Sequence, residues 1–249
     1  MIKQLFVICL LAISYNANTL ALELSSGPQQ TTLLELYTSE GCSSCPPADR
    51  WLSKLKSNQH LWQQVVPVAF HVDYWNQLGW PDRFSSAAYS ARQHNYRRHN
   101  YLNVVYTPGF VRNGREWRGW FERQALPLNT TNEVGILKAS IDKAGIQAEF
   151  TPSKPVKESL TLNIAFLGFN QITDIQRGEN RGKILKHDFV VMDFHQLTQK
   201  TDGQSHHWQL ANIADNIPSG VSGIAVWVTT KDDPTPLQAI GGYLDVKKL

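Results

Sequence analysis

The chain has 249 residues, of which 42% are hydrophobic and 18% are charged. This composition is typical of a globular protein, and the length suits one large domain or two smaller ones. The formal net charge of +3 is too small to indicate nucleic-acid binding, so we expect no nucleic-acid partner.

The first 21 residues have the order of an export signal. Lys3 supplies a positive charge, Leu5–Ile13 is an apolar core too short to cross a bilayer, and Thr19–Ala21 fits a cleavage site. We therefore expect residues 1–21, with Cys9, to be removed and the mature protein to be exported, either periplasmic or secreted. No later segment approaches the about 20 apolar residues of a membrane span, so we expect no integral membrane segment.

A strand, a helix and a second strand are predicted next. Leu33–Tyr37 and Val65–Val72 are short apolar runs typical of buried strands, and Ala48–Leu55 places its apolar side chains on one helical face. Pro46 and Pro47 are tolerated only in the first helical turn, so the helix starts at or just before the cysteines. This order predicts a βαβ unit with parallel strands.

The middle of the chain mixes aromatic residues with arginines. We expect residues 73–101 to form a helical insertion, with Ser85 or Ser86 capping a helix that runs through Arg97. A strand Phe110–Arg112 and an Asn113-Gly114 hairpin turn follow. Thr131–Ala144 has apolar residues at helical spacing before Gly145, which predicts another helix.

From Gln147 the pattern changes to strand-like runs separated by turn residues. This pattern predicts a small antiparallel β-sandwich, with a linker near Phe150–Pro155. The expected organisation is therefore a signal peptide (1–21), an α/β domain (22–149) and a β-sandwich domain (150–249). The histidines of the last segment, among them His187, are interpreted as surface or core residues.

Two motifs resemble the glutaredoxin and thioredoxin fold. Tyr37-Thr38 followed by the CxxC motif Cys42–Cys45 is similar to its active-site entry, and Pro108 before a strand that turns at Asn113-Gly114 is similar to its second half. In that fold the proline follows a cis bond. The phrases "LELYTSEGCSSCPPAD", "FHVDYWNQLGWPDRFSS", "VYTPGFVRNG" and "GENRGKILKHDFVV" also resemble a family of exported bacterial proteins, domain of unknown function 1223. That resemblance implies a thioredoxin-like N-terminal domain followed by an Ig-like β domain, without a known reaction.

The CxxC pair is the main candidate for chemistry. A cysteine at a helix N-terminus is acidified, and a second cysteine within reach can resolve a mixed disulfide. Cys42, expected to be the more exposed, is the predicted nucleophile, and Cys45 is the predicted resolving cysteine. Thr107, beside a cis Pro108, is expected to offer its backbone to a substrate strand. Glu35 is a candidate for proton transfer or, equally, a structurally paired carboxylate.

Three functions remain open at this stage. The first is a cell-envelope thiol–disulfide oxidoreductase without a cofactor, whose partners are protein thiols or disulfides. The second is a binding module in which Cys42 and Cys45 form a structural disulfide, as exported pairs readily do. The third is a copper- or zinc-handling protein in which His71 joins the two thiolates.

Overall fold

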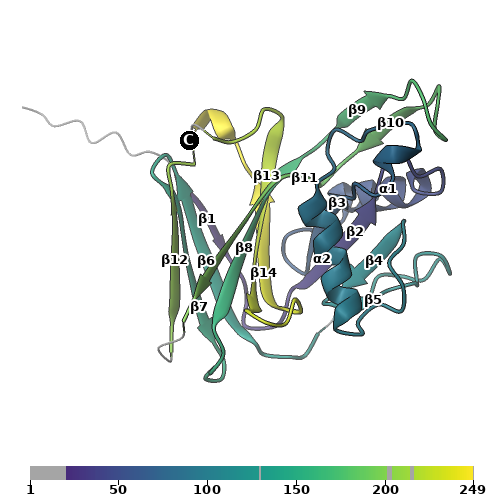
Figure 1. Ribbon diagram of the computed structural model, residues 1–249. Helices are drawn as coiled ribbons and strands as arrows, with labels where there is room; N and C mark the ends of the chain where they lie inside the picture. The colour runs from purple at the N-terminus through teal and green to yellow at the C-terminus, as the bar shows by residue number, and fades with distance from the viewer. Residues whose placement is uncertain (1–20, 129, 201–203, 214–215, 249) are drawn as a thin grey trace, which may run out of the picture.

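The computed structural model describes residues 21–248 except 129, 201–203 and 214–215. The predicted signal peptide, apart from Ala21, lies outside these residues. The described chain is a mixed α/β protein with two α-helices and mostly strands (Figure 1). The helices are α1 (Pro46–Ser53) and α2 (Ala87–Arg98), with short 3₁₀ helices at Lys54–Ser57, Asn76–Leu78 and Val246–Lys248.

An eight-stranded mixed sheet runs through the molecule. In spatial order its strands are β14 (Pro236–Tyr243), β13 (Val221–Thr230), β8 (Leu160–Gly168), β11 (Val190–Gln199), β3 (Val65–His71), β2 (Thr32–Thr38), β4 (Gly109–Arg112) and β5 (Arg115–Glu116). Strands β2 and β3 are parallel, which confirms the predicted βαβ unit. The β4–β5 hairpin turns at Asn113 and Gly114, both with positive φ, which confirms the predicted turn.

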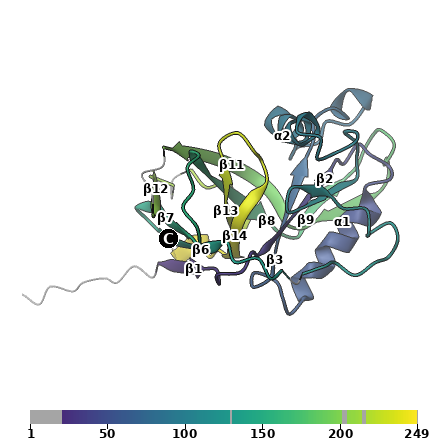
Figure 2. The same cartoon turned by 90° about the horizontal axis from the view of Figure 1, so that it is seen from below.

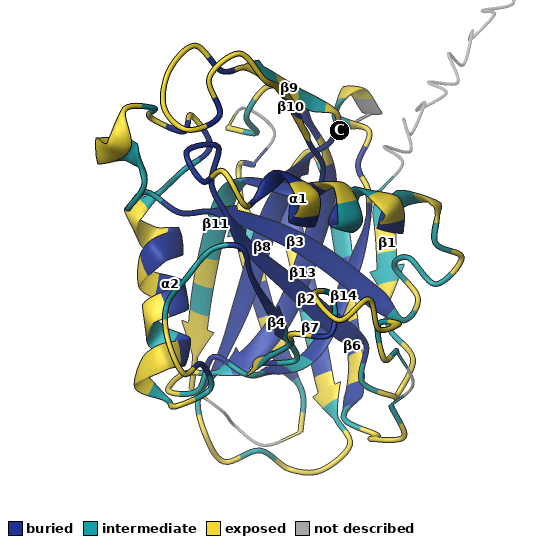
Figure 3. Cartoon of the chain, turned by 90° about the vertical axis from the view of Figure 1, so that its right-hand side faces the viewer, coloured by how far each residue is buried: buried dark blue, intermediate teal, exposed yellow. Residues whose placement is uncertain are grey.

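Helices α1 and α2 cover opposite faces of β2 and β3 (Figure 2). Neighbouring residues of a strand point to opposite faces. Thr38 accordingly contacts Asp49 of α1, while Glu35 contacts Arg92 of α2. Helix α2 begins at Ser86, whose hydroxyl accepts a hydrogen bond from the N–H of Ala88, as the capping prediction required. Figure 3 shows that β2 and β3, between the two helices, are buried along their length.

The helix predicted for Thr131–Ala144 is wrong, because this segment contains strand β6 (Gly135–Asp142). It pairs antiparallel with β7 (Gly145–Pro152). Leu137, Ala139 and Ile141 are buried, and the residues between them are more exposed. Those apolar residues have a strand period of two, but Leu137 and Ile141 are also four apart, and Val134 adds a further helical spacing of three before Leu137.

A four-stranded antiparallel sheet forms a second layer. Its order is β1 (Leu22–Ser25), β6, β7 and β12 (His206–Ala211). Its apolar face packs against β8, β13 and β14, and a core fills the space between the two sheets (Figure 2). The opposite face of these C-terminal strands contributes Leu167 and Trp227 to the core around β2 and β3. The same strands therefore serve two cores.

Strand β11 connects the two halves of the chain in one sheet. It is antiparallel to β8 along most of its length and parallel to β3 at Val190 and Ala69. Strand β7 also runs across residue 150, where the domain boundary was expected. Among the described residues, no separate Ig-like domain is seen, and no helix is long and apolar enough to cross a membrane.

A two-stranded hairpin leaves the C-terminal strands and reaches helix α1 (Figure 1). It consists of β9 (Gln171–Asp174) and β10 (Ile184–His187). This hairpin brings the second half of the chain to the CxxC motif, although more than a hundred residues separate the two in sequence.

Candidate functional site

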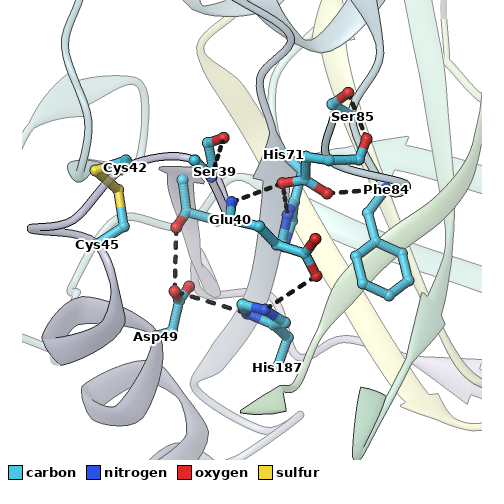
Figure 4. Close-up of polar contacts among 12 residues, drawn as sticks. Ser39, Glu40, Cys42, Cys45, Asp49, His71, Phe84, Ser85 and His187 are labelled. Atoms are coloured by element: carbon cyan, nitrogen blue, oxygen red, sulfur yellow. Dashed lines mark hydrogen bonds and ion pairs between the residues drawn. A yellow bond between two sulfur atoms is a disulfide. The ribbon is translucent and has the colours of Figure 1, made fainter. Parts of the chain in front are cut away.

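The site is centred on a disulfide between Cys42 and Cys45 at the start of α1 (Figure 4). Their Cα atoms are 5.4 Å apart, and Cys45 is the N-cap residue of the helix. Pro46 and Pro47 occupy the first helical positions, where a missing N–H costs nothing. The structure thus confirms that the helix begins at the cysteines, and the amino end of α1 faces the disulfide.

Both cysteines are fully buried, each with 0% of its surface exposed. The expectation that Cys42 is the more exposed of the two is therefore wrong. The residues between them, Ser43 and Ser44, are exposed, so only the loop backbone and these hydroxyls face solvent. The hydroxyl of Ser44 lies 3.4 Å from the Cys42 sulfur, close enough to stabilise charge on it.

The loop of Pro108 is tied to the CxxC loop through Trp75. The Thr107–Pro108 peptide bond is cis, as the motif predicted. The indole N–H of Trp75 donates a 2.8 Å hydrogen bond to the Thr107 hydroxyl. On its other side Trp75 packs on Gly41, where an added Cβ would lie 3.1 Å from the Trp75 Cβ. A larger residue at Gly41 would push these two loops apart.

Glu35 lies on the α2 face of β2 and has partners of its own. Its carboxylate accepts 2.8 and 3.0 Å hydrogen bonds from Arg92, and it also accepts from the hydroxyls of Tyr37 and Tyr96. All four residues are buried. None of these contacts involves a cysteine. The hydroxyl of Tyr96 also donates a hydrogen bond to the carbonyl of Pro234. The cluster joins α2 to the loop before β14, while a proton-transfer role for Glu35 stays a prediction.

A buried group of ionisable residues lies beside the disulfide instead. His187, at the end of β10, is placed between Glu40 and Asp49, with 3.6 Å from each ring nitrogen to a carboxylate oxygen (Figure 4). Glu40 comes two residues before Cys42, and Asp49 lies one helical turn after Cys45. Residues four apart on a helix share a face, so Asp49 is on the Cys45 side of α1.

These contacts set the charge of His187. Burial alone would lower its pKa, but the two carboxylates outweigh that effect and raise the pKa to about 10. For Glu40, an acid, burial alone would raise the pKa. Hydrogen bonding to His187 and other neighbours outweighs burial and brings the pKa of Glu40 below its usual value. At neutral pH, His187 therefore carries a proton, and its positive charge lies between the two carboxylates.

His71 belongs to a second buried pair. Its Nδ1 lies 2.7 Å from an Asp82 oxygen that also accepts a hydrogen bond from the Glu40 N–H. The contact with His71 keeps the pKa of the Asp82 carboxyl below its usual range even though burial acts in the opposite direction. The rings of His71 and His187 are in contact, with centroids 4.9 Å apart. Across the described chain, no group of three or more His, Cys, Asp or Glu residues is arranged to hold a metal ion.

A small cavity connects this buried group to the surface. It has a volume of about 110 Å³ and lies between α1 and β10. Pro46, Asp49, Ile184 and His187 are among its lining residues.

Asn180 also belongs to the site, because its side chain donates to the carbonyls of Glu40 and Cys42. No sequence pattern singles out Glu40, Asp49 or Asn180, and the sequence predicts His187 to be an ordinary surface or core residue. Glu40 and Asp49 flank the cysteines within "SEGCSSCPPAD", and Asn180 and His187 lie in "GENRGKILKHDFVV". Both phrases supported the family resemblance, which was the only available signal. No spacing rule places the second phrase against the first.

Fold and site together define a mixed α/β protein with a buried CxxC disulfide at the N-terminus of a helix. Residues 33–229 match the family described as "Protein of unknown function (DUF1223)". The chain belongs to the DUF1223 family, which confirms that resemblance in the sequence.

Two solved structures are similar over most of the chain. Protein AGR_C_4864 from Agrobacterium tumefaciens is 25% identical with a TM-score of 0.61, over 88% of this chain and 96% of that one. HBP35 of Porphyromonas gingivalis is 15% identical with a TM-score of 0.53, over 88% of this chain and 77% of that one. At that identity the second likeness concerns the fold alone. No curated protein matches the chain significantly.

Proposed function

We propose that this protein is a thiol–disulfide oxidoreductase of the cell envelope, with Cys42 as nucleophile and Cys45 as resolving cysteine. The observation that carries the proposal is the CxxC disulfide at the start of α1. Trp75 ties its loop to the loop of the cis Pro108, and Glu40 and Asp49 of the buried His187 group flank it in sequence. In this proposal the strands β2 to β5 with α1 and α2 form a thioredoxin-like unit, and the remaining strands correspond to the Ig-like part.

The oxidised protein would accept two electrons from a partner dithiol. A substrate thiolate attacks the Cys42 sulfur, the Cys42–Cys45 bond breaks, and Cys45 leaves with the bonding electrons as a thiolate. The second substrate thiolate then attacks the mixed disulfide at the substrate sulfur, and Cys42 leaves as a thiolate. The substrate ends as a disulfide and the protein as a dithiol, and the reverse sequence reduces a substrate.

Each thiolate that leaves needs a proton or a stabilising charge. The amino end of α1 favours the thiolate form. In this proposal a proton path to Cys45 starts at Asp49, which lies one helical turn after Cys45 and contacts His187. The cavity between α1 and β10 supplies exchange with water. In this proposal Thr107, whose hydroxyl accepts a hydrogen bond from Trp75, pairs through its backbone with the substrate.

The redox potential of the Cys42–Cys45 pair tests this proposal. The purified protein is equilibrated in glutathione buffers, and free thiols are trapped and counted. Catalytic dithiols span about −270 to −120 mV, and we expect a value within that range. Cys42→Ser is expected to abolish exchange, whereas Cys45→Ser should accumulate a mixed disulfide with the substrate. Equal exchange activity in the two variants would contradict the assigned roles.

A second function is favoured by the burial of both cysteines. A disulfide with 0% exposure is well placed to act as a structural crosslink in a binding module. Structural disulfides lie below about −300 mV, so the same measurement separates the two functions. A value there would also explain why neither sulfur reaches the surface.

A further inference from the structure

The loop at the end of the β9–β10 hairpin contacts the CxxC loop directly. This tip segment, residues 176–183, belongs to the C-terminal half and passes over the start of α1 (Figure 1). The buried side chain of Asn180 donates hydrogen bonds to the carbonyls of Glu40 and Cys42, at 2.8 and 3.0 Å. The carboxylate of Glu179 accepts a 3.2 Å hydrogen bond from the N–H of Ser43. These contacts hold the tip segment against the residues on both sides of Cys42.

The tip segment has few other contacts with the rest of the chain: Gly178 packs against Trp80, and Gly182 and Lys183 pair with the backbone of Ile175. Apart from Asn180, all of its residues are exposed, and none of them has a large apolar side chain. Gly178 and Gly182 adopt positive φ, which allows the tight loop without packing against a core. Its attachment is therefore a few hydrogen bonds and the contact of Gly178 with Trp80. Each of these hydrogen bonds contributes modestly and exchanges readily with water. The hairpin strands below it are anchored separately, by Lys56 to Asp188 and by Arg83 to Ile172.

We propose that the tip segment is a redox-responsive lid: Asn180 and Glu179 close it over the disulfide, and reduction of Cys42 opens it. This proposal deepens the proposed function and rests on it, because the lid responds only if the Cys42–Cys45 disulfide is reducible. In the closed form, neither sulfur can be attacked from solution. A partner must displace the segment, which makes Asn180 and Glu179 determinants of which thiols can react.

Reduction would change the charge that Glu179 faces. Dithiothreitol supplies two electrons and two protons, its own thiols closing into a ring disulfide while the Cys42–Cys45 bond becomes two thiols. Cys42, at the amino end of α1, then loses a proton to water and becomes a thiolate. Glu179 accepts its hydrogen bond from the N–H of Ser43, the residue next to Cys42. The Glu179 carboxylate and the Cys42 thiolate are both negative, and they then compete for this one donor. The carboxylate is displaced, and the tip segment with it.

Limited proteolysis with trypsin reads out the lid directly, because Arg177, Arg181 and Lys183 all lie in the tip segment. Cleavage at these three sites is followed by mass spectrometry in the oxidised and the dithiothreitol-reduced protein. We expect cleavage to be about tenfold faster in the reduced protein, the effect of a like-charge contact near the surface. Equal rates in the two states would overturn the proposal.

Variants separate the roles of the two residues. Asn180→Ala is expected to be cleaved at the fast rate in both redox states, and its disulfide should be reduced by dithiothreitol about tenfold faster than that of the wild type. Glu179→Gln keeps an acceptor for Ser43 without the charge, so the difference between redox states should disappear. Glu158→Gln, an exposed glutamate outside the hairpin, is the matched control and should behave like the wild type.

A Cys42→Ser/Cys45→Ser variant separates charge from bond loss, since it has neither disulfide nor thiolate. It should be cleaved at the slow rate with and without dithiothreitol. Fast cleavage would show that loss of the bond alone frees the segment, and would overturn the role of Glu179. Proteolysis needs no substrate, so a redox potential outside the catalytic range would reject the proposed function and leave the lid result standing.

Discussion

The alkaline stability of the protein should depend on His187. Its pKa in the folded state is about 10, against about 6.5 for an unfolded histidine. Because the folded pKa is the higher one, this contribution to stability is complete below pH 6.5 and is lost as the pH rises toward 10. Each pKa unit corresponds to about 1.4 kcal/mol, so the full loss is on the order of 5 kcal/mol.

Urea unfolding of the oxidised protein at pH 6.5, 8 and 9.5 measures this loss. The wild type should lose about 1.4 kcal/mol of unfolding free energy per pH unit across this range. His187→Gln should start less stable, because Glu40 and Asp49 lose their positive partner, and should then change little with pH. His207→Gln, on an exposed position of β12, is the control and should keep the wild-type slope. Parallel losses in the wild type and His187→Gln would refute the ionic role of His187.

Three further substitutions test the fold by urea or thermal unfolding. Glu35→Gln should cost about 3–5 kcal/mol, because the buried guanidinium of Arg92 loses its charged partner; a change below about 1 kcal/mol would show that this pair is dispensable. Ser86→Ala removes the cap of α2 and should cost about 1 kcal/mol, whereas an unchanged midpoint would mean that tertiary contacts alone hold the helix start. Gly114→Ala places a Cβ 2.7 Å from the Thr235 hydroxyl at a positive φ, and should cost about 1–3 kcal/mol; wild-type stability there would contradict the strain argument.

Local signals were sufficient for the N-terminal half of the fold. The apolar runs that became β2 and β3, the prolines that start α1, the Ser86 cap and the Asn113-Gly114 turn all act within a few residues. The helix prediction for the segment that forms β6 is wrong because its apolar residues fit both the helical and the strand period. Only pairing with β7, which the sequence does not specify locally, decides between a helix and a strand.

The candidate site was predictable only where its residues are close in sequence. Cys42 and Cys45 form a recognisable motif, and the cis bond before Pro108 followed from the motif resemblance. The partners from the hairpin, Asn180 and His187, arrive through the topology of the C-terminal strands. Neither their spacing nor their residue type distinguishes them from ordinary loop and core residues, and Cys42 was expected to be exposed because this cover could not be foreseen.

The distance in sequence between the two parts of the site has a consequence for how the protein matures. Asn180 is 138 residues after Cys42, so the hairpin is synthesised well after the CxxC motif, and closing such a long loop is slow. Until the hairpin docks, the two cysteines form an open dithiol on a partly folded chain. The disulfide can therefore be introduced by an outside oxidant before the site is covered, and docking of the hairpin then seals the oxidised state into the finished protein.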